Sequence, residues 1–265
     1  MPEPFLYNLL GTPFIELDSV DSTNNYALTQ LHAGLAQHGT AFFAHEQVAG
    51  KGQRGKTWST QKDSSLILSL VINPQLLQLT QQFHLSACIA LSVCEFFGSY
   101  AGNSTCIKWP NDLYWYDRKA GGILIENIIG SKNPEDTASW LWAVIGIGVN
   151  INQVSFPGEL KNPVSLKQIT GKNFDPVQLA KELCSIIDKN FKQLITKGFE
   201  DIYIAYLSFL YKKNEPVKLK KGNRVFEAVI KSVLPTGELI VQHAIEEIFR
   251  FGEIEWVITT GKQEK

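Results

Sequence analysis

One lysine of the 265-residue chain stands where a charged side chain is costly. Lys108 lies between Ile107 and Trp109 at the end of a strand-like run, and the turn-forming sequence Pro-Asn-Asp follows at 110–112. A lysine that is partly removed from water needs an anionic partner, because burial disfavours its charged form. That partner is either a carboxylate of the chain, such as Asp112, or an anionic group of a ligand.

A second candidate site is a glycine-rich basic loop that joins two strand-like runs. Its sequence, AGKGQRGKTW, contains three glycines and three cations, namely Gly50, Gly52, Gly55, Lys51, Arg54 and Lys56. Such a loop can present backbone N–H groups and positive charge to a phosphate or a carboxylate. It is neither a P-loop nor a dinucleotide fingerprint, since no GK[ST] occurs and no helix follows directly. Taken alone, it also fits a basic surface turn.

The third candidate is a strand-like segment that loses its side chains at alternate positions. It reads Gly146-Ile147-Gly148-Val149-Asn150. Glycines inside a strand indicate either a close approach by a ligand or backbone, or a β-bulge. An amide such as that of Asn150 offers both a donor and an acceptor, which can recognise the edge of an adenine.

Strands and helices must position these segments, and their order predicts an α+β fold. Strand-like runs occupy 12–18, 40–47, 64–73, 105–109, 120–128 and 139–149, with turns at the PND sequence and around 133–134. Helical spacing is seen over 22–39, 82–100 and 175–198, the last with Asp175 as cap and Pro176 at its first position. The elements mix without the regular alternation of a parallel-sheet protein.

The composition changes near residue 214. Short strand-like runs follow at 216–220, 225–231, 238–243, 246–251 and 255–258, which predicts a small five-stranded barrel. We therefore expect a catalytic domain over 1–213 and a carboxyl-terminal domain over 214–265. Basic residues in the first half of this module are balanced by acidic residues in the second, so its surface does not indicate nucleic-acid binding.

The overall composition narrows the possible classes. A hydrophobic content of 44% excludes a disordered chain, and 25 basic against 26 acidic residues argue against a nonspecific nucleic-acid coat protein. The amino terminus lacks a basic region before its short apolar stretch, and the apolar run 88–97 is far too short to span a membrane. The four cysteines form no CxxC pair. We expect a cytoplasmic protein with no nucleic-acid or membrane partner and no fixed metal site.

Taken in order, the segments resemble biotin protein ligases. The blocks are Asp21-Ser22-Thr23-Asn24, Gln47 before Gly50–Trp58, KWPND with Asp117, Lys119 and GGILIE after it, and GIGVN. The resemblance runs from about residue 14 to residue 152 and continues loosely through the barrel. The signature KWPNDxxxxxxKxxGILIE is highly specific.

The resemblance implies a fold and an activity. The fold would be a mixed β-sheet backed by helices, like the catalytic domain of class II aminoacyl-tRNA synthetases, followed by an SH3-like barrel. The enzyme would use biotin and MgATP to make biotinyl-5′-AMP and would transfer biotin to a lysine of a biotin carboxyl carrier protein. We expect a monofunctional ligase, because few residues precede the first strand-like run and leave no room for a DNA-binding domain. We expect it to be a monomer or a homodimer.

The resemblance also assigns residues. Lys108 would be catalytic, contacting the reacting carboxylate and the α-phosphate. Biotin would be bound by Ser22, Thr23, Asn24, Gln47, Lys51, Gly52, Gln53, Lys108, Gly122 and Gly146. ATP and the adenylate would be bound by Gly50, Lys51, Gly52, Gln53, Arg54, Gly55, Trp58, Asn111, Lys119, Gly148 and Asn150.

Two other protein classes stay open, and one residue differs from the pattern of the family. A lipoate–protein ligase shares the chemistry on a different acyl group, and a biotin-responsive regulator would carry a DNA-binding domain. The departure is Gln53, because family members commonly read GRGRxGRxW where this chain reads GKGQRGKTW. We expect the neighbouring Arg54 to supply the missing charge on the adenylate phosphate.

Overall fold

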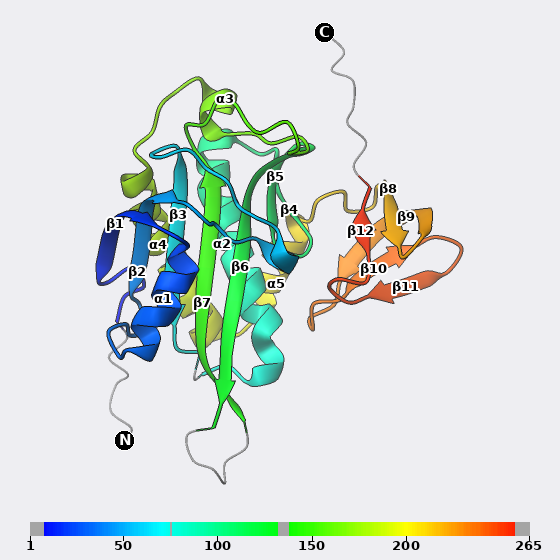
Figure 1. The fold of residues 1–265 in the computed structure, drawn as a ribbon. Helices are drawn as coiled ribbons and strands as arrows, with labels where there is room; N and C mark the ends of the chain where they lie inside the picture. Colours follow the sequence, from blue (N-terminus) through cyan, green and yellow to red (C-terminus); the bar gives the residue numbers. More distant parts are fainter. Residues whose placement is uncertain (1–7, 75, 132–137, 258–265) are drawn as a thin grey trace.

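A seven-stranded mixed sheet forms the larger part of the molecule (Figure 1). The computed structural model describes residues 8–74, 76–131 and 138–257. The strands are β1 (Phe14–Val20), β2 (Ala41–Gln47), β3 (Ser65–Ile72), β4 (Thr105–Lys108), β5 (Asp112–Trp115), β6 (Arg118–Gly130) and β7 (Ser139–Asn150), in the spatial order β1-β2-β3-β7-β6-β5-β4. Only the β1–β2 pair is parallel among the described pairs of this sheet.

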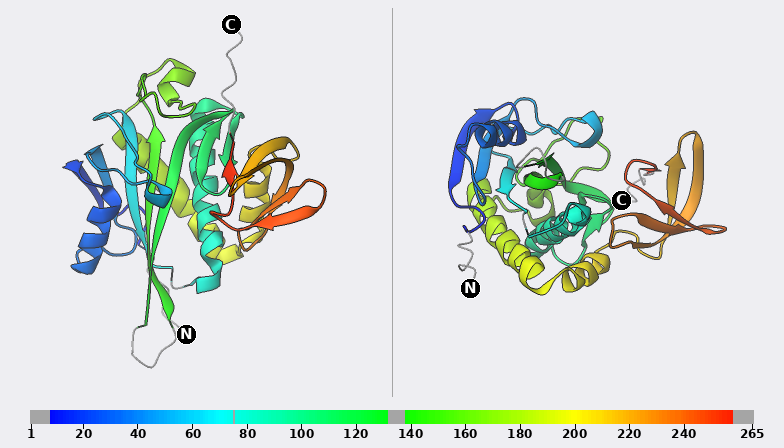
Figure 2. Two further views of the ribbon diagram at one scale, coloured as in Figure 1. Left: turned by 45° about the vertical axis from the view of Figure 1, so that its right-hand side comes forward. Right: turned by 90° about the horizontal axis from the view of Figure 1, so that it is seen from below.

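Helices cover the two faces of this sheet unequally (Figures 1 and 2). The face behind the sheet in Figure 1 is covered by α2 (Gln82–Ala101), which follows η2 (Leu79–Gln81), and by α4 (Pro176–Lys197). The front face carries α1 (Thr23–His32) near β2, β3 and β7. The short helices are α3 (Leu166–Thr170), α5 (Glu200–Ser208) and η1 (Gln53–Gly55). Away from α1, the front face is therefore covered by loops, among them the glycine-rich one.

The apolar side chains of the strands explain this layering. Every residue of β3 is buried, because this strand lies between the helices behind the sheet and α1 in front. Leu66, Leu68 and Leu70 join the large core on the α2 and α4 side, while Val71 joins a smaller cluster with Ala27 and Leu31 of α1. The alternation assigns Gly146 and Gly148 of β7 to the front face, since Ile145 and Ile147 point into the rear core.

Helix α2 is packed as a core helix. By length and hydropathy alone, the segment Leu79–Ala101 could cross a membrane. The apolar run 88–97, which is only part of this segment, is too short to do so. In the fold most residues of the segment are buried, and α2 contacts α4, α5 and β4. The segment therefore belongs to the interior of the folded domain.

A second, five-stranded antiparallel sheet follows in the chain. It contains β8 (Pro216–Lys221), β9 (Arg224–Val233), β10 (Leu239–Gln242), β11 (Glu246–Phe249) and β12 (Glu255–Trp256), in the order β11-β10-β9-β8-β12. It is docked on the first part of the molecule, since Trp109 Nε1 donates a hydrogen bond to the carbonyl of Gly237 at 2.9 Å. Buried side chains of both sheets belong to one apolar cluster.

The predicted fold class is confirmed, with several differences in the elements. Helix α4 begins after the Asp175 cap, whose Oδ1 accepts from Val177 N at 2.9 Å, as predicted. Helix α1 ends at His32 rather than near residue 39. Strand β1 is displaced toward the carboxyl terminus from the expected 12–18, and strand β6 extends beyond the expected 120–128 at both ends. Strand β5 and helices α3 and α5 were not predicted. The turn expected around 133–134 lies outside the described residues.

Candidate active site

A row of paired residues crosses the front face of the large sheet. Lys108 of β4 is opposite Asp112 of β5, which is opposite Gly122 of β6. Gly122 is in turn opposite Gly148 of β7, and Gly148 is opposite Ile67 of β3. Residues directly opposite one another in neighbouring strands share one face of a sheet. The register therefore places the lysine, the carboxylate and two glycines of three separate sequence blocks side by side.

The charges of this row sit at the β4–β5 edge of the sheet. Lys119 Nζ contacts Asp112 Oδ1 at 2.6 Å, whereas Lys108 Nζ is 3.8 Å from Asp112 Oδ2. The predicted ion pair between Lys108 and Asp112 is thus present, but the carboxylate is shared with a second lysine. Two cations and one anion leave an excess positive charge in the row, which suits an anionic ligand.

Lys108 is held in a largely dry environment. Its side chain is only 9% exposed. Burial lowers the pKa of Lys108 to about 8, an effect that Asp112 opposes and that the neighbouring charges of Lys119 and Lys56 increase. At neutral pH the ammonium is still charged, and little water competes for it. Such a cation interacts strongly with negative charge that develops beside it.

A second group of predicted residues lies beside the row. It surrounds the pair Gly146 and Ser69, two residues along β7 and β3 from the pair Gly148 and Ile67. Thr23 offers both its backbone N–H and its hydroxyl to Gln47 Oε1, at 2.8 and 3.1 Å. Asn24 Nδ2 donates to Glu126 Oε2 at 2.7 Å. Ser22, Thr23 and Asn24 are all buried at the start of α1. The structure therefore brings together four of the ten residues that the resemblance assigns to biotin, namely Ser22, Thr23, Asn24 and Gln47.

Ser69 connects this group to the sheet and was not identified from the sequence. Its Oγ lies 2.8 Å from Thr23 Oγ1 and 2.6 Å from Asn24 Oδ1. It is fully buried in β3, opposite Gly146. A lone serine within the apolar run LILSLVI was the available signal, because a buried hydroxyl needs a partner.

The two glycines of β7 are required by the side chains that lie over them. A Cβ on Gly146 would be 2.4 Å from Asn24 Oδ1, and a Cβ on Gly148 would be 2.6 Å from the ring of Trp58. The pairing of β7 with β3 and β6 runs through both positions without a register shift. The alternative of a bulge at these positions is therefore wrong, and the glycines mark a close approach.

The glycine-rich loop closes on itself as a small hairpin. Gly52 N donates to Lys56 O at 2.7 Å, and Trp58 N donates to Gly50 O at 2.8 Å. A Cβ on Gly50 would be 2.3 Å from the carbonyl oxygen of Trp58. Gly50 and Gly52 thus allow the loop to fold in this way, whether or not it also presents its backbone N–H groups to a ligand.

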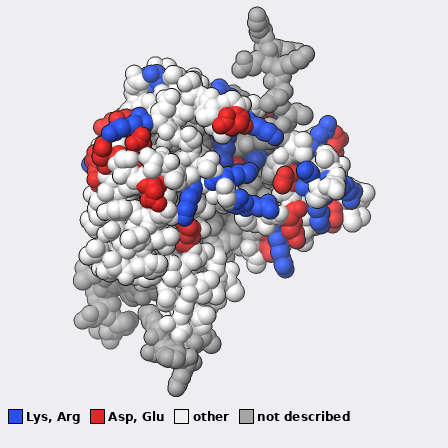
Figure 3. Space-filling view, in the orientation of Figure 1, with Lys and Arg blue, Asp and Glu red and all other residues white. Residues whose placement is uncertain are grey.

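The cations of this loop point to different places. Arg54 is exposed, has a φ of 56°, and its guanidinium lies beside Gly252 of the second sheet, 3.7 Å from where a Cβ would be. Lys56 is close enough to Lys108 to lower its pKa. Figure 3 shows Lys and Arg side chains gathered where the two sheets meet. Within the loop, Lys56 rather than Arg54 is the cation that acts on the Lys108 end of the row.

Asn150 and Trp58 complete the front face at its far end. Asn150 is buried, and its Nδ2 donates to the carbonyl of Val164 at 3.1 Å, so this donor already has a partner in the chain. Trp58 lies over Gly148, and its Nε1 is buried without a partner in the part of the chain that is described. The ring of Trp58 is also 5.9 Å from Lys119 Nζ.

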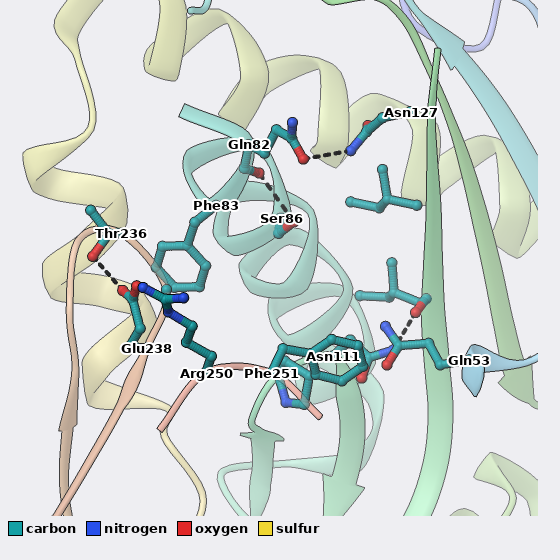
Figure 4. A pocket seen from close by; sticks show the side chains of 14 residues that line it. Gln53, Gln82, Phe83, Ser86, Asn111, Asn127, Thr236, Glu238, Arg250 and Phe251 are labelled. Carbon is teal, nitrogen blue, oxygen red and sulfur yellow. Dashed lines mark hydrogen bonds between the residues drawn. The ribbon is translucent and has the colours of Figure 1, made fainter. Parts of the chain in front are cut away.

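A cavity of about 460 Å³ adjoins this site between the two sheets (Figure 4). Two predicted residues, Gln53 and Asn111, line it, together with Phe83 of α2 and Arg250 and Phe251 of the second sheet. It also borders Ile123 and Ile125 of β6, which alternate with the front-face residues of that strand. Gln53 and Asn111 are thus at the edge of the sheet, apart from the other predicted residues.

Metal ligands are not grouped in the described ranges. Over residues 8–74, 76–131 and 138–257, no set of three or more His, Cys, Asp or Glu side chains is arranged to hold a metal ion.

Comparisons with known proteins agree with the geometry. Residues 16–150 match the model of the biotin/lipoate A/B protein ligase family. The biotin--[acetyl-CoA-carboxylase] ligase of Paracoccus denitrificans is 31% identical over 233 residues, which is 85% of this chain and 92% of that protein. The bifunctional ligase/repressor BirA of Bacillus spizizenii is 30% identical over 91% of this chain and 73% of its own length.

A solved structure extends the similarity to the whole fold. The biotin protein ligase of Aquifex aeolicus, in complex with biotin and ATP, has a TM-score of 0.76 and 27% identity, covering 92% of this chain and 98% of that one. The chain belongs to the biotin/lipoate A/B protein ligase family.

Proposed function

We propose that the chain activates biotin with ATP and transfers it to a lysine of a biotin carboxyl carrier protein. In the first step, a carboxylate oxygen of biotin attacks the α-phosphate of ATP, and the bond to pyrophosphate breaks to give biotinyl-5′-AMP. In the second step, the amine of the acceptor lysine attacks the carbonyl carbon of the anhydride. AMP leaves, and the amine loses a proton as the amide forms.

The observation that carries this proposal is the row that joins a buried cation to a polar pocket. The first step brings two anions together, so fixed positive charge is the main contribution that a protein can make. Lys108 and Lys119 supply it at one end of the row, with Asp112 between them. Lys108 contacts the biotin carboxylate and the α-phosphate in this account, and Mg²⁺ arrives as the complex with ATP.

The pocket around α1 accounts for the choice of acid. The ureido ring of biotin carries two N–H groups and a carbonyl oxygen, whereas the dithiolane ring of lipoate offers no comparable donor or acceptor. The buried side chains of Ser22 and Thr23, with the half-buried Gln47, form a polar group of matching chemistry. Burying polar side chains against a ring that cannot pair with them is unfavourable. The site therefore favours biotin over lipoate.

The remaining predicted residues have roles in holding ATP and in excluding water. The loop 50–58 lies over the row, with Trp58 against Gly148, and shields the anhydride from hydrolysis. Trp58, Gly148 and Asn150 form the end of the site that takes the adenine. One N–H of the Asn150 amide is bonded to Val164, so the contact with adenine would use the second N–H or the carbonyl oxygen of the side chain.

The location that we propose is the cytoplasm. The four cysteines are free, and burial raises the pKa of the Cys88 and Cys94 thiols, which keeps both unreactive. Free buried thiols are typical of a reducing compartment.

The proposed function is tested by transfer of radiolabelled biotin to a recombinant carrier domain. We expect labelling that requires ATP, releases AMP, and is lost when the acceptor lysine is replaced by arginine. Labelled lipoate at the same concentration, with its own carrier domain, is the comparison. Transfer of lipoate with no transfer of biotin would contradict the proposal.

A further inference from the structure

The last described strand of the second sheet reaches the row of the large sheet. Strand β12 pairs with β8, with Trp256 opposite Leu219. The ring of Trp256 lies 5.2 Å from Lys108 Nζ. The ring of Tyr114 lies 5.0 Å from the same atom. Lys108 Nζ is therefore close to two aromatic rings that come from different sheets.

These rings matter because the other partner of the ammonium is weak. Asp112 contacts Lys108 at 3.8 Å and contacts Lys119 at 2.6 Å, so the shorter bond goes to the second lysine. A cation within about 6 Å of the centroid of an aromatic ring is attracted to it, and the attraction is stronger where water is excluded. The rings replace part of the lost hydration without neutralising the charge.

A third aromatic residue packs near both of these rings. The ring of Tyr211 lies 5.1 Å from that of Tyr114 and 5.6 Å from that of Trp256. Its hydroxyl donates to Asp117 Oδ1 at 2.7 Å, and its backbone N donates to the carbonyl of Ile107 at 2.9 Å. Ile107 precedes Lys108 in β4, so the strand that carries the lysine is tied directly to this aromatic cluster.

We propose that Trp256 is a positioning residue for adenylate formation, because its ring and that of Tyr114 fix the Lys108 ammonium at its end of the row. The second sheet thereby becomes part of the adenylation site. This inference rests on the proposed role of Lys108. Trp256 acts through Lys108, and the polar pocket around α1 does not depend on it.

The test is a double-mutant cycle on ligand affinity. Dissociation constants for biotin and for biotinyl-5′-AMP are measured for the full chain and for Trp256→Leu, Lys108→Ala and the double variant. We expect Trp256→Leu to weaken adenylate binding about tenfold and to change biotin binding by less than about twofold. In the Lys108→Ala background the same substitution should have an effect of less than about twofold, because the residue through which it acts is gone.

Two further variants separate the ring from the fold. Trp256→Phe keeps an aromatic face and should stay within about threefold of the full chain for the adenylate. Phe226→Leu, at another half-buried ring of the same sheet, is the matched control and should leave both affinities unchanged. If Trp256→Leu does not fold, Trp256→Met replaces it with the same expected result.

The outcomes distinguish the possible failures. Unchanged adenylate affinity in Lys108→Ala would remove Lys108 from its proposed role and this inference with it. A strong effect of Lys108→Ala without an effect of Trp256→Leu would overturn the inference alone. Equal effects of Trp256→Leu in both backgrounds would show that it does not act through Lys108. Trp256→Phe as damaging as Trp256→Leu would point instead to the indole N–H, whose Nε1 is buried without a partner among the described residues.

Discussion

At the scale of single residues, the ionisation of Lys108 links burial to activity. Burial lowers its pKa to about 8, so the free enzyme holds the charged form below that pH and loses it as the pH rises further. The charged form is the one that stabilises the meeting of carboxylate and phosphate. An ordinary lysine would stay charged throughout this range.

With biotin and ATP both well below their KM values, the rate of adenylate formation should therefore fall above about pH 8, by about tenfold per pH unit. Under these conditions the pH dependence reports the pKa of the enzyme before either substrate binds. Lys108→Arg is the control, because a guanidinium remains charged over the whole range. Its residual activity should show no such decline, and a decline that persists in Lys108→Arg would assign the titration to another group.

Gly146 gives a steric test of the biotin pocket. A Cβ at this position would be 2.4 Å from Asn24 Oδ1, and Asn24 is held by Ser69 and Glu126, so it cannot move aside easily. Gly146→Ala should weaken biotin binding at least about tenfold, in line with a typical overpacking cost of 1–3 kcal/mol. Gly158→Ala, where a Cβ would meet nothing within 4 Å, is the control. Calorimetric titration with biotin measures both, and equal affinities would contradict the placement of the pocket.

Local sequence was sufficient for some of these residues and not for others. The Lys108–Asp112 pair and the start of α1 could be predicted, because each depends on neighbours in one short segment. Ser69 and Trp256 could not, since their partners lie 45 or more positions away in the chain. Register across β3 and β7, and the docking of the second sheet, determine those contacts.

At the scale of elements, we expect the loop 50–58 to determine how firmly the adenylate is held. Gln53 stands where the resemblance expects arginine, Arg54 lies beside Gly252, and Lys56 acts on Lys108. The placement of Arg54 makes it a poorer substitute than the sequence suggested. Whether any of these residues contacts the phosphate stays a prediction.

Release of labelled biotinyl-5′-AMP distinguishes the loop residues. Gln53→Arg should slow release about tenfold or more, because it adds a charge-assisted hydrogen bond, which contributes about 1.5–3 kcal/mol. Lys56→Ala should speed release, and Arg54→Ala should change it little. Faster release from Arg54→Ala, together with no change in Gln53→Arg, would show that Arg54 is the residue that grips the phosphate.

The elements that sequence missed share a physical cause. Strand β5 has only four residues and begins directly after the turn that was predicted, so no periodicity could develop. Helix α5 has nine residues, of which Ile202 and Tyr206 are buried, and it starts soon after Gly198 ended the previous helix. In contrast, α4 carries a cap, a proline at its first position and a long apolar stripe, and it was predicted at both ends.

At the scale of the whole molecule, the two sheets contact each other beside Lys108. Trp109 follows Lys108 and bonds to Gly237, while Trp256 covers Lys108 from the other sheet. The expected boundary between residues 213 and 214 falls between α5 and β8. The contacts across it predict that the second sheet contributes to adenylate retention as well as to stability.

Loosening the junction should therefore affect catalysis. A Cβ on Gly237 would lie 2.8 Å from the ring of Phe83, so Gly237→Ala should push the second sheet away from α2. We expect a decrease of about 1–3 kcal/mol in the free energy of unfolding and faster loss of biotinyl-5′-AMP. Gly198→Ala, at a φ of 86° and with nothing within 4 Å of the added Cβ, controls for backbone strain. Denaturant unfolding and adenylate release are measured on both, and matching values would contradict the prediction.

The central claim is that the pocket binds biotin and the charged row activates it, as two separable parts of one site. Pyrophosphate exchange and biotin affinity measured together on Lys108→Ala test this most directly. We predict that exchange falls about 100-fold or more, the loss of about 3 kcal/mol expected for a removed transition-state contact, while biotin affinity stays within about threefold. Near-normal exchange in Lys108→Ala, or loss of biotin binding as large as the loss of exchange, would contradict the account.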